Sequence, residues 1–445
     1  MSTPSSTPET PRSEAALSAW HGALRRWRRS GLILAVLLLA GCSTVPRIPY
    51  TAAEETAAGI PNMADVRAFT NVPEPTFRKA VCPDLIAAAN RAAKPTYLAL
   101  SGGGADGAYG AGVLNGWTAS GTRPEFLVVS GVSTGAMIAP FAFLGPSYDG
   151  VLRQLYTSGV AESLLASPRL GSVLLGSGVF GNQRLRELLA RYVDRVMLAR
   201  IAAEYAKGRC LAVVTTDLDA QRAVVWNMGR IASYGSPAAL ELFRDVLAAS
   251  ASTPVVLPPV FIEAEANGRT FQEMHVDGGV TAPVFTLPEA FLLSNARPER
   301  RLRLNIYVLI NNTLDPDFQV VPDRNIDIAG QTVSTMLKAR TRSVIFRTYE
   351  FAQNNGLGFN LTYLDEEGLD CAIGFDTVCM RRLYDYGFEK ARSGRFWQKS
   401  PPSPGPHIVA QRRPRGIMGR GMRIDARFGP VFEAAAERPV PQLGD

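Results

Sequence analysis

Histidine is scarce in this sequence of 445 residues, which holds three, at positions 21, 275 and 407. Zinc sites in proteins are built from histidine or from clustered cysteine, and none of the five cysteines stands at metal-ligand spacing. His21 belongs to a leader and His407 to a proline-rich segment, so His275 is the only histidine expected in the ordered core. These shortages argue against a zinc site.

Long apolar runs are also lacking near the N-terminus. The run at residues 31–40 is about half of the ~20 residues that a membrane-spanning helix needs. It follows four arginines between positions 25 and 29 and ends in Leu39-Ala40-Gly41-Cys42, an order that favours a secretory signal over a plain membrane anchor. The segment resembles the bacterial lipoprotein signal. That resemblance implies a signal peptide at residues 1–41 and a lipid on Cys42.

The residue after the lipidated cysteine bears on where the protein resides. Ser43, rather than an aspartate, resembles the signal of outer-membrane lipoproteins. We therefore expect a lipid-anchored protein of a bacterial cell envelope, on the periplasmic side of the outer membrane.

Strong positive charge is missing from the mature chain. The formal net charge is +7, but residues 1–41 hold five arginines and two acids, which leaves +4 for the remainder. No basic run beyond the leader is interleaved with aromatic residues. These features argue against a nucleic-acid partner.

Four cysteines follow Cys42, and four can pair in three ways in an oxidising compartment. Cys371 and Cys379 are eight residues apart and could close a local loop. Cys210 lies in an apolar run that predicts a strand, so we expect it to be a buried free thiol.

Strand and helix patterns succeed one another along the chain. Residues 43–75, rich in Pro, Ala, Thr and Glu, predict a tether, with ordered structure beginning near Phe77. Strands are expected at 96–100, 126–129, 210–216, 223–226, 261–266, 270–276, 301–311 and 357–363, and helices at 84–93, 182–199, 237–249, 327–351 and 380–396. The apolar, glycine-rich residues 163–182 are interpreted as a lid or acyl-chain contact, or as a buried loop with a short helix.

One turn stands out for its chemistry. The apolar strand at 126–129 leads into Gly131-Val132-Ser133-Thr134-Gly135, and small residues then predict a closely packed helix. Strand, G-x-S-x-G and helix is the context of a nucleophile elbow, in which the glycines let strand and helix approach each other. The alternative is a glycine- and serine-rich turn without chemistry.

A glycine loop follows the strand at 96–100, with Gly102, Gly103, Gly104 and Gly107. The spacing also fits a dinucleotide fingerprint, which requires an acid at the end of the second strand. The only nearby acid, Glu125, stands at the start of that strand. We therefore favour an oxyanion hole, in which backbone N–H groups of the loop face the serine.

Asp277-Gly278-Gly279 is the third motif, and its alternative reading is an ordinary Asp-Gly turn at a strand end. A serine nucleophile needs a base within hydrogen-bond reach, and a rigidly held carboxylate can serve. His275 raises the competing idea of a Ser–His–Asp triad. Residues i and i+2 of a strand project side by side, which suits the end-to-end geometry of a triad badly. We predict a structural role for His275.

In this order the three motifs resemble those of the patatin-like phospholipases. Residues 251–254 (ASTP) and 257–259 (LPP) are similar to that family's segment ahead of its aspartate motif. The resemblance covers about residues 94–291. It implies an α/β fold with a central, mostly parallel sheet flanked by helices, in a three-layer architecture with a Ser–Asp dyad and no cofactor.

The resemblance also implies roles. Ser133 is the nucleophile, Asp277 is its base, and the N–H groups of Gly102, Gly103 and Gly104 form the oxyanion hole for hydrolysis of lipid acyl esters. Asp106 departs from the family, which usually has Arg or Lys there, so a neutral lipid ester competes with a phospholipid as substrate. The alternative function is a catalytically silent lipoprotein that uses the fold for binding or assembly.

The expected organisation combines these inferences. The signal peptide at 1–41 is followed by a tether and lead-in at 42–93, the patatin-like domain at 94–291 and a C-terminal α/β extension packed on the core at 292–398. Residues 399–445, rich in Pro, Gly and Arg, are expected to be a poorly packed tail.

Overall fold

The computed structural model describes residues 47–165, 179–254, 257–288, 304–316, 318, 320–366, 369, 371 and 375–402. These residues belong to the unit that ends at Pro401, with Pro402 as the first residue of a second unit. The expected signal peptide, Cys42, most of the segment 163–182 and the tail beyond Pro402 lie outside the described residues.

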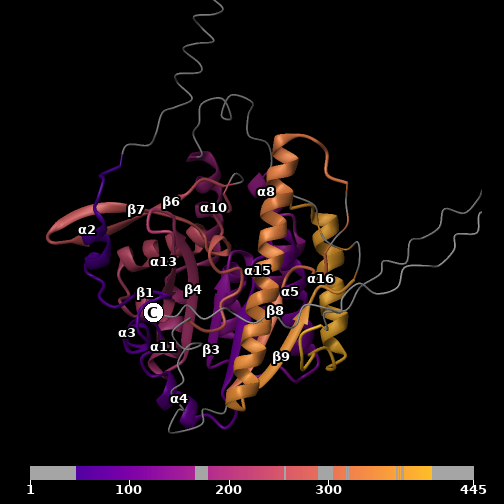
Figure 1. The fold of residues 1–445 in the computed structure, drawn as a ribbon. Helices are drawn as coiled ribbons and strands as arrows, with labels where there is room; N and C mark the ends of the chain where they lie inside the picture. The colour runs from indigo at the N-terminus through magenta and orange to yellow at the C-terminus, as the bar shows by residue number, and fades with distance from the viewer. Residues whose placement is uncertain are drawn as a thin grey trace, which may run out of the picture. The chain divides into compact units, whose positions relative to one another are not determined.

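A sheet organises the described chain (Figure 1). Its central strands β4, β3, β2, β8 and β9 are parallel neighbours in that order, and β1 and β5 join the β4 edge in antiparallel fashion. The strands are β1 (Arg67–Phe69), β2 (Thr96–Leu100), β3 (Val128–Val132), β4 (Cys210–Asp217), β5 (Arg222–Asn227), β6 (Val260–Ala266), β7 (Arg269–Asp277), β8 (Asn305–Ile310) and β9 (Gly358–Tyr363).

The hairpin of β6 and β7 enters this sheet at the point where β3 ends. β3 pairs with β4 as far as Val132, which lies opposite Val214. β5 occupies the other side of β4, so β7 takes over the side that β3 leaves, with Asp277 opposite Thr215. The end of β3 and the end of β7 therefore meet beside β4.

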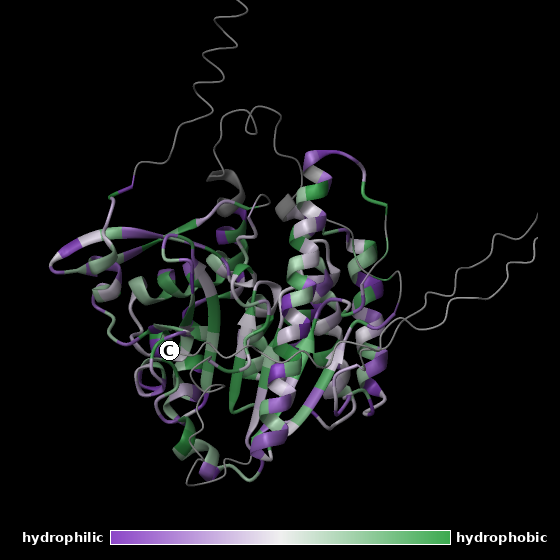
Figure 2. Ribbon diagram, viewed as in Figure 1, coloured by the Kyte–Doolittle hydropathy of each residue, from purple (hydrophilic) through white to green (hydrophobic). Residues whose placement is uncertain are grey.

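Helices cover both faces of the sheet, and each layer closes its own apolar core. One layer contains α5 (Gly107–Ala119), α6 (Thr134–Leu144), α7 (Asp149–Thr157), α10 (Val179–Tyr192), α11 (Arg195–Ala206), α12 (Met228–Ser233), α13 (Pro237–Ser250) and α16 (Thr377–Arg392). The other contains α3 (Glu74–Val81), α4 (Leu85–Arg91) and α15 (Asn325–Asn355). Figure 2 shows that the central strands between these layers are largely hydrophobic. The predicted α/β fold with a mostly parallel central sheet is confirmed.

The helix predicted over 182–199 is two helices. α10 ends at Tyr192, and α11 begins at Arg195 after Asp194, whose carboxylate accepts a hydrogen bond from the N–H of Met197 at 2.8 Å. A side chain that caps a new helix start in this way interrupts the preceding one. Two further short helices are α2 (Ala52–Ala57) and α8 (Glu162–Leu165).

The predicted tether over residues 43–75 is wrong for the part that the structure describes. β1 pairs with β5 at the sheet edge, and the ring of Tyr50 stacks on Phe271 with centroids 4.5 Å apart. A strand of three residues is too short to produce a periodic sequence signal, which is why composition alone suggested a tether.

The prediction of a free thiol at Cys210 is also wrong, because this residue forms a disulfide with Cys82. The partners are 128 residues apart, and Cys82 follows α3, which packs beside β1 and β5. Such a pairing leaves no local trace in the sequence. The predicted local loop is confirmed by the disulfide between Cys371 and Cys379.

None of the helices within the described residues combines the length and the apolar character needed to cross a membrane.

Candidate active site

Ser133 stands at the turn between β3 and α6 in an unusual backbone conformation. Its φ of 55° and ψ of −125° lie in a region that residues with a side chain rarely adopt. A Cβ on Gly131 would lie 2.4 Å from the carbonyl oxygen of Gly135, and one on Gly135 would lie 2.5 Å from that of Leu100. Glycine is therefore required at both positions for the strand and the helix to meet at so sharp a turn.

Asp277 lies directly against this serine. Ser133 Oγ donates a hydrogen bond to Asp277 Oδ2 at 2.6 Å, and both residues are buried. Thr253 Oγ1 donates to the same carboxylate oxygen at 2.8 Å, and the N–H of Gly279 donates to Oδ1 at 2.7 Å. The carboxylate is fixed from three directions while one oxygen faces the serine hydroxyl.

The neighbourhood of Asp277 changes its proton affinity. Burial raises the pKa of this carboxyl above its ordinary value, and the hydrogen bonds from Ser133, Gly279 and Thr253 offset the rise only in part. A carboxylate that has lost part of its hydration is a stronger base than one in water. The site thus holds a serine hydroxyl beside a carboxylate with increased basicity.

Two more residues, at the end of α13 and just after it, hold Ser133 and Asp277 in place. Ser250 Oγ accepts a hydrogen bond from the N–H of Ser133 at 3.0 Å and donates to the carbonyl of Val214 at 2.7 Å. The N–H of Asp277 donates to the carbonyl of Ser252 at 3.0 Å. Sequence reasoning missed Ser250 and the bond from Thr253. The segment 251–254, singled out for its resemblance, was the signal that could have found Thr253.

The glycine loop after β2 lies next to Ser133. A Cβ on Gly102 would be 3.2 Å from the Cβ of Ser133, and one on Gly103 would be 2.7 Å from the Cβ of Asn311. The N–H of Gly102 donates to the carbonyl of Pro283 at 3.0 Å. Within the described chain, the N–H groups of Gly103 and Gly104 donate to no acceptor. These two are the loop's open donors.

Asp106, the position of reversed charge, holds three segments together. Its Oδ1 accepts a hydrogen bond from the N–H of Cys371 at 2.8 Å, and its Oδ2 accepts one from Asn312 Nδ2 at 3.3 Å. The side chain is buried at the start of α5, where Gly107 meets Thr134 of α6. Asp106 thus joins the glycine loop to the segment after β8 and to the disulfide loop before α16.

The side chain of His275 contacts residues other than Ser133. Its Nδ1 lies 3.0 Å from Thr215 Oγ1, and its Nε2 lies 3.2 Å from Glu273 Oε2. Trp226 packs edge-on against the buried imidazole. Both ring nitrogens therefore have partners other than Ser133.

A buried charge cluster surrounds this histidine. Arg67 Nη2 donates to Glu273 Oε1 at 2.8 Å, and Arg67 Nη1 pairs with the other oxygen of the same carboxylate. Burial would raise the pKa of Glu273, but the charge and hydrogen bonds of Arg67, together with the contact of His275, outweigh it and lower that pKa to about 2. Sequence reasoning missed this pair, which joins β1 to β7.

Among the described residues, Asp217, Glu273 and His275 are the group whose ligand atoms lie close enough to hold a metal ion, within 4.8 Å of one another. The guanidinium of Arg67 already engages both oxygens of Glu273 and supplies the positive charge that a cation would bring. We therefore assign no metal to this group.

A comparison with known protein families assigns part of the chain to one of them. Residues 98–288 match the family model of patatin-like phospholipases, within the 94–291 drawn from the sequence motifs. This segment is a patatin-like phospholipase domain, the domain of a lipid hydrolase, and the predicted family is confirmed.

No curated protein matches the chain. Among solved structures, the chain is similar to the crystal structure of VipD from Legionella pneumophila, at 13% identity, over 67% of this chain and 66% of that one, with a TM-score of 0.35. This chain thus covers just under two thirds of VipD, and we draw no argument from so distant a likeness.

Proposed function

We propose that this protein is a membrane-anchored serine hydrolase that cleaves carboxylic ester bonds of lipids, as a phospholipase A or a lysophospholipase does. The observation that carries the proposal is the 2.6 Å hydrogen bond from Ser133 Oγ to the buried carboxylate of Asp277. A buried carboxylate in direct contact with a serine on a strained turn is the pairing that activates a weak nucleophile. Membership of residues 98–288 in a lipid hydrolase family supplies the substrate class.

The reaction follows from the arrangement of these groups. Asp277 Oδ2 accepts the proton of Ser133 as Oγ bonds to the ester carbonyl carbon, and the carbonyl oxygen takes up negative charge. Collapse of this intermediate breaks the bond to the alcohol oxygen, which receives the proton from Asp277. Water then attacks the acyl carbon and gives a proton to Asp277. Collapse of the second intermediate breaks the bond between Ser133 Oγ and the acyl carbon, Oγ recovers the proton from Asp277, and the carboxylic acid leaves.

The N–H groups of Gly103 and Gly104 are the donors we assign to the oxyanion. The sequence motif suggested Gly102 as a third, but its N–H is engaged by the carbonyl of Pro283. Donors fixed before the reaction stabilise the developing charge without further reorganisation. Asn311 holds this loop in place through hydrogen bonds with the carbonyl oxygen and Oγ of Ser101.

The proposed anchor is a lipid on Cys42, in the bacterial cell envelope. It is supported by the Leu39-Ala40-Gly41-Cys42 sequence behind a basic and apolar leader. The two disulfides fit an oxidising compartment outside the cytoplasm. Replacement of Cys42 by Ser should abolish incorporation of radiolabelled palmitate in cells, and normal labelling of that variant would refute the anchor.

The experiment for the proposed activity compares the wild type with Ser133→Ala. The wild type should hydrolyse a short-chain chromogenic ester and bind a fluorophosphonate covalently, and Ser133→Ala should do neither while its circular dichroism is unchanged. A wild-type protein that reacts with neither reagent would instead favour the silent lipoprotein. Lipid profiling of membranes that carry each form would then distinguish phospholipids from neutral esters as substrates.

A further inference from the structure

The first half of α15 projects beyond the sheet. In Figure 1 it extends past the ends of β8 and β9. Among the described side chains of this helix, burial begins at Thr341 and continues with Ile345, Thr348 and Ala352. The core therefore holds mainly the second half of the helix, and none of the described side chains between Asn325 and Arg340 is fully buried.

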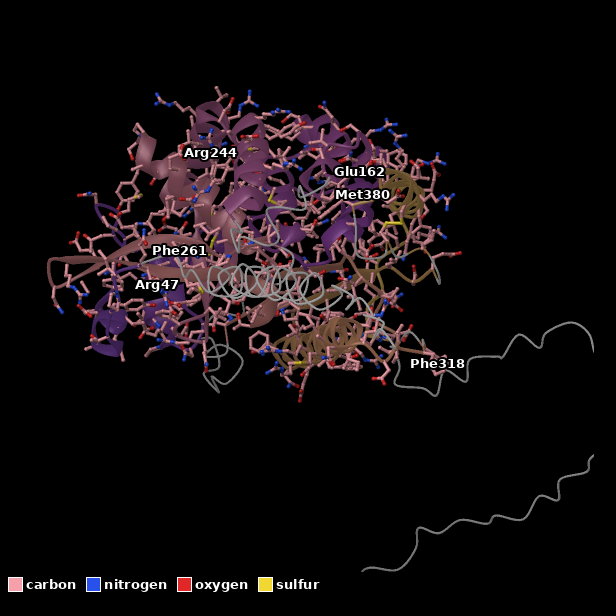
Figure 3. The ribbon with its side chains drawn as sticks, turned by 90° about the horizontal axis from the view of Figure 1, so that it is seen from above. Arg47, Glu162, Arg244, Phe261, Phe318 and Met380 are labelled. Atoms are coloured by element: carbon pink, nitrogen blue, oxygen red, sulfur yellow. A yellow bond between two sulfur atoms is a disulfide. The ribbon has the colours of Figure 1, made fainter. Side chains whose placement is uncertain are left out.

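The turns between Asn325 and Arg340 expose large apolar side chains. Val333 is 53% exposed and Met336 is 57% exposed, and Ile328 is also exposed. Phe318 and Val320, just before the helix, are more exposed still, and Figure 3 shows Phe318 at the periphery of the described side chains. A cluster of this kind on one element indicates an interaction site rather than ordinary surface variation.

The charge of this helix has one sign over a long stretch. Residues 328–349 contain four basic residues and no acidic one. Arg340 and Arg347 lie on the exposed side of the helix. Exposed apolar residues together with basic ones, in the part of α15 that lies between its two acids, Asp327 and Glu350, are the features of a helix that rests on an anionic lipid surface.

This part of α15 lies against the proposed active site. Arg340 Nη1 donates a hydrogen bond at 2.7 Å to the carbonyl of Val280, three residues after Asp277. A Cβ on Gly279 would lie 3.7 Å from Leu337 Cδ2, and the side chain of Val280 is itself exposed. The apolar turns are therefore continuous with the loop that carries the proposed base.

We propose that an overhang surface, formed by Phe318, Val320, Ile328, Val333, Met336 and Arg340, docks on an anionic lipid bilayer. The proposal rests on the proposed function in that docking brings Ser133 to the lipid whose ester it cleaves. The apolar side chains enter the boundary between headgroups and acyl chains, and Arg340 binds lipid phosphate. A lipid on Cys42 keeps the protein at the membrane, whereas the overhang surface orients it.

The first experiment measures docking on vesicles and does not depend on hydrolytic activity. Full-length protein carrying Met336→Cys or Val378→Cys is labelled with bimane and reconstituted into vesicles of equimolar phosphatidylcholine and phosphatidylglycerol. Val378 lies on α16 and is also 57% exposed, so it is a matched control. The fluorescence at position 336 should shift to the blue in these vesicles and shift less in pure phosphatidylcholine, while that at position 378 should not change. No shift at 336, or equal shifts at both positions, would overturn the proposal.

The second experiment measures how docking affects the hydrolysis of lipid in vesicles. The double variant Val333→Asp/Met336→Asp should lower the ratio of vesicle-lipid to soluble-ester hydrolysis by at least about tenfold, because the acids are repelled by the anionic surface and two apolar contacts are lost. Val196→Asp/Val378→Asp places the same changes at matched exposure on α11 and α16, and should keep the wild-type ratio. An unchanged ratio in the first variant would overturn the proposal.

The two readouts separate the possible failures. A wild-type protein that hydrolyses no ester would refute the proposed function, and the bimane shift would still decide docking. A shift at position 336 that needs no vesicles and grows with protein concentration would assign the surface to a second copy of the chain, which overturns lipid docking.

Discussion

Asp277 of β7 lies opposite Thr215 of β4. The preceding residue of β4, Val214, is the last one that pairs with β3. Because β3 stops there and β7 takes its place, a serine at the end of β3 and an aspartate at the end of β7 are brought into contact. The two residues are 144 positions apart in the sequence, and the pairing of both strands with β4 brings them together.

The hydrogen bond from Thr253 to Asp277 predicts a shift in pH dependence. Asp277 must be deprotonated to act as a base, so kcat/KM on a soluble ester should fall as the pH drops through its raised pKa. Thr253→Val removes a bond that favours the carboxylate, so the acid limb should move to higher pH. Thr253→Ser retains the hydroxyl and should leave the limb in place. A Val variant with the wild-type profile would show that this bond does not tune the base.

A side chain at position 103 should disturb the N–H groups assigned to the oxyanion. In Gly103→Ala the new Cβ would lie 2.7 Å from the Cβ of Asn311, which is bonded to Ser101, so the loop must shift. Loss of one donor should lower kcat about 10²–10³-fold with little change in melting temperature. Gly59→Ala, where a Cβ meets open space, is the control. A kcat equal to that of the wild type would contradict the assignment.

The buried pair of Arg67 and Glu273 predicts a loss of stability. Arg67→Met leaves the Glu273 carboxylate buried without its guanidinium partner, which should lower the free energy of unfolding by about 3–5 kcal/mol near neutral pH. The double variant Arg67→Met/Glu273→Leu should be less destabilised than Arg67→Met alone. Urea unfolding measures both, and a single variant as stable as the wild type would show that the pair contributes little.

The same pair predicts how stability depends on acid. The pKa of Glu273 in the folded protein is lowered from 4.5 to about 2, so its contribution is complete above the pKa of the unfolded chain. This contribution should be lost as the pH falls from about 4.5 toward 2. Arg67→Met should flatten this part of the stability profile, because the carboxylate no longer has the charge that lowers its pKa. An unflattened profile would assign the acid sensitivity to other groups.

The disulfide between Cys82 and Cys210 predicts a further loss when it is removed. Cys82→Ala/Cys210→Ala should lower the free energy of unfolding by about 2–5 kcal/mol, because the bond closes a long loop in the unfolded chain. Non-reducing peptide mapping by mass spectrometry tests the pairing itself. A free thiol at position 210 would restore the view taken from the sequence.

The sequence was informative where function needs a local pattern. Gly131 and Gly135 are required by a single turn, and the alternation of Leu304, Ile306 and Val308 marks β8, so motifs and strands of this kind could be predicted. Contacts between distant segments left no such pattern. Arg67 meets Glu273 and Cys82 meets Cys210 only because β1 and α3 return to the far edge of the sheet.

At the glycine loop the sequence predicted the oxyanion donors only in part, again because a distant segment makes a contact there. Three glycines in a row predicted three donors, yet the carbonyl of Pro283 takes the N–H of Gly102. Pro283 reaches the loop because the chain turns after Gly279, and no pattern in residues 102–104 records that neighbour. In the sequence, Asp106 was only a departure from the basic residue usual in the family. Its structural role became apparent from its hydrogen bonds with Cys371 and Asn312.

The assignment of the base is the centre of this account, and the most direct test is the single-turnover acylation rate of two folded variants. Asp277→Asn is nearly isosteric but cannot accept the proton of Ser133, so it should lose nearly all acylation. His275→Asn should keep a substantial fraction, because the imidazole contacts Thr215 and Glu273 rather than the serine. If His275→Asn is as inactive as Ser133→Ala while remaining folded, or if Asp277→Asn acylates like the wild type, the Ser133–Asp277 mechanism is wrong.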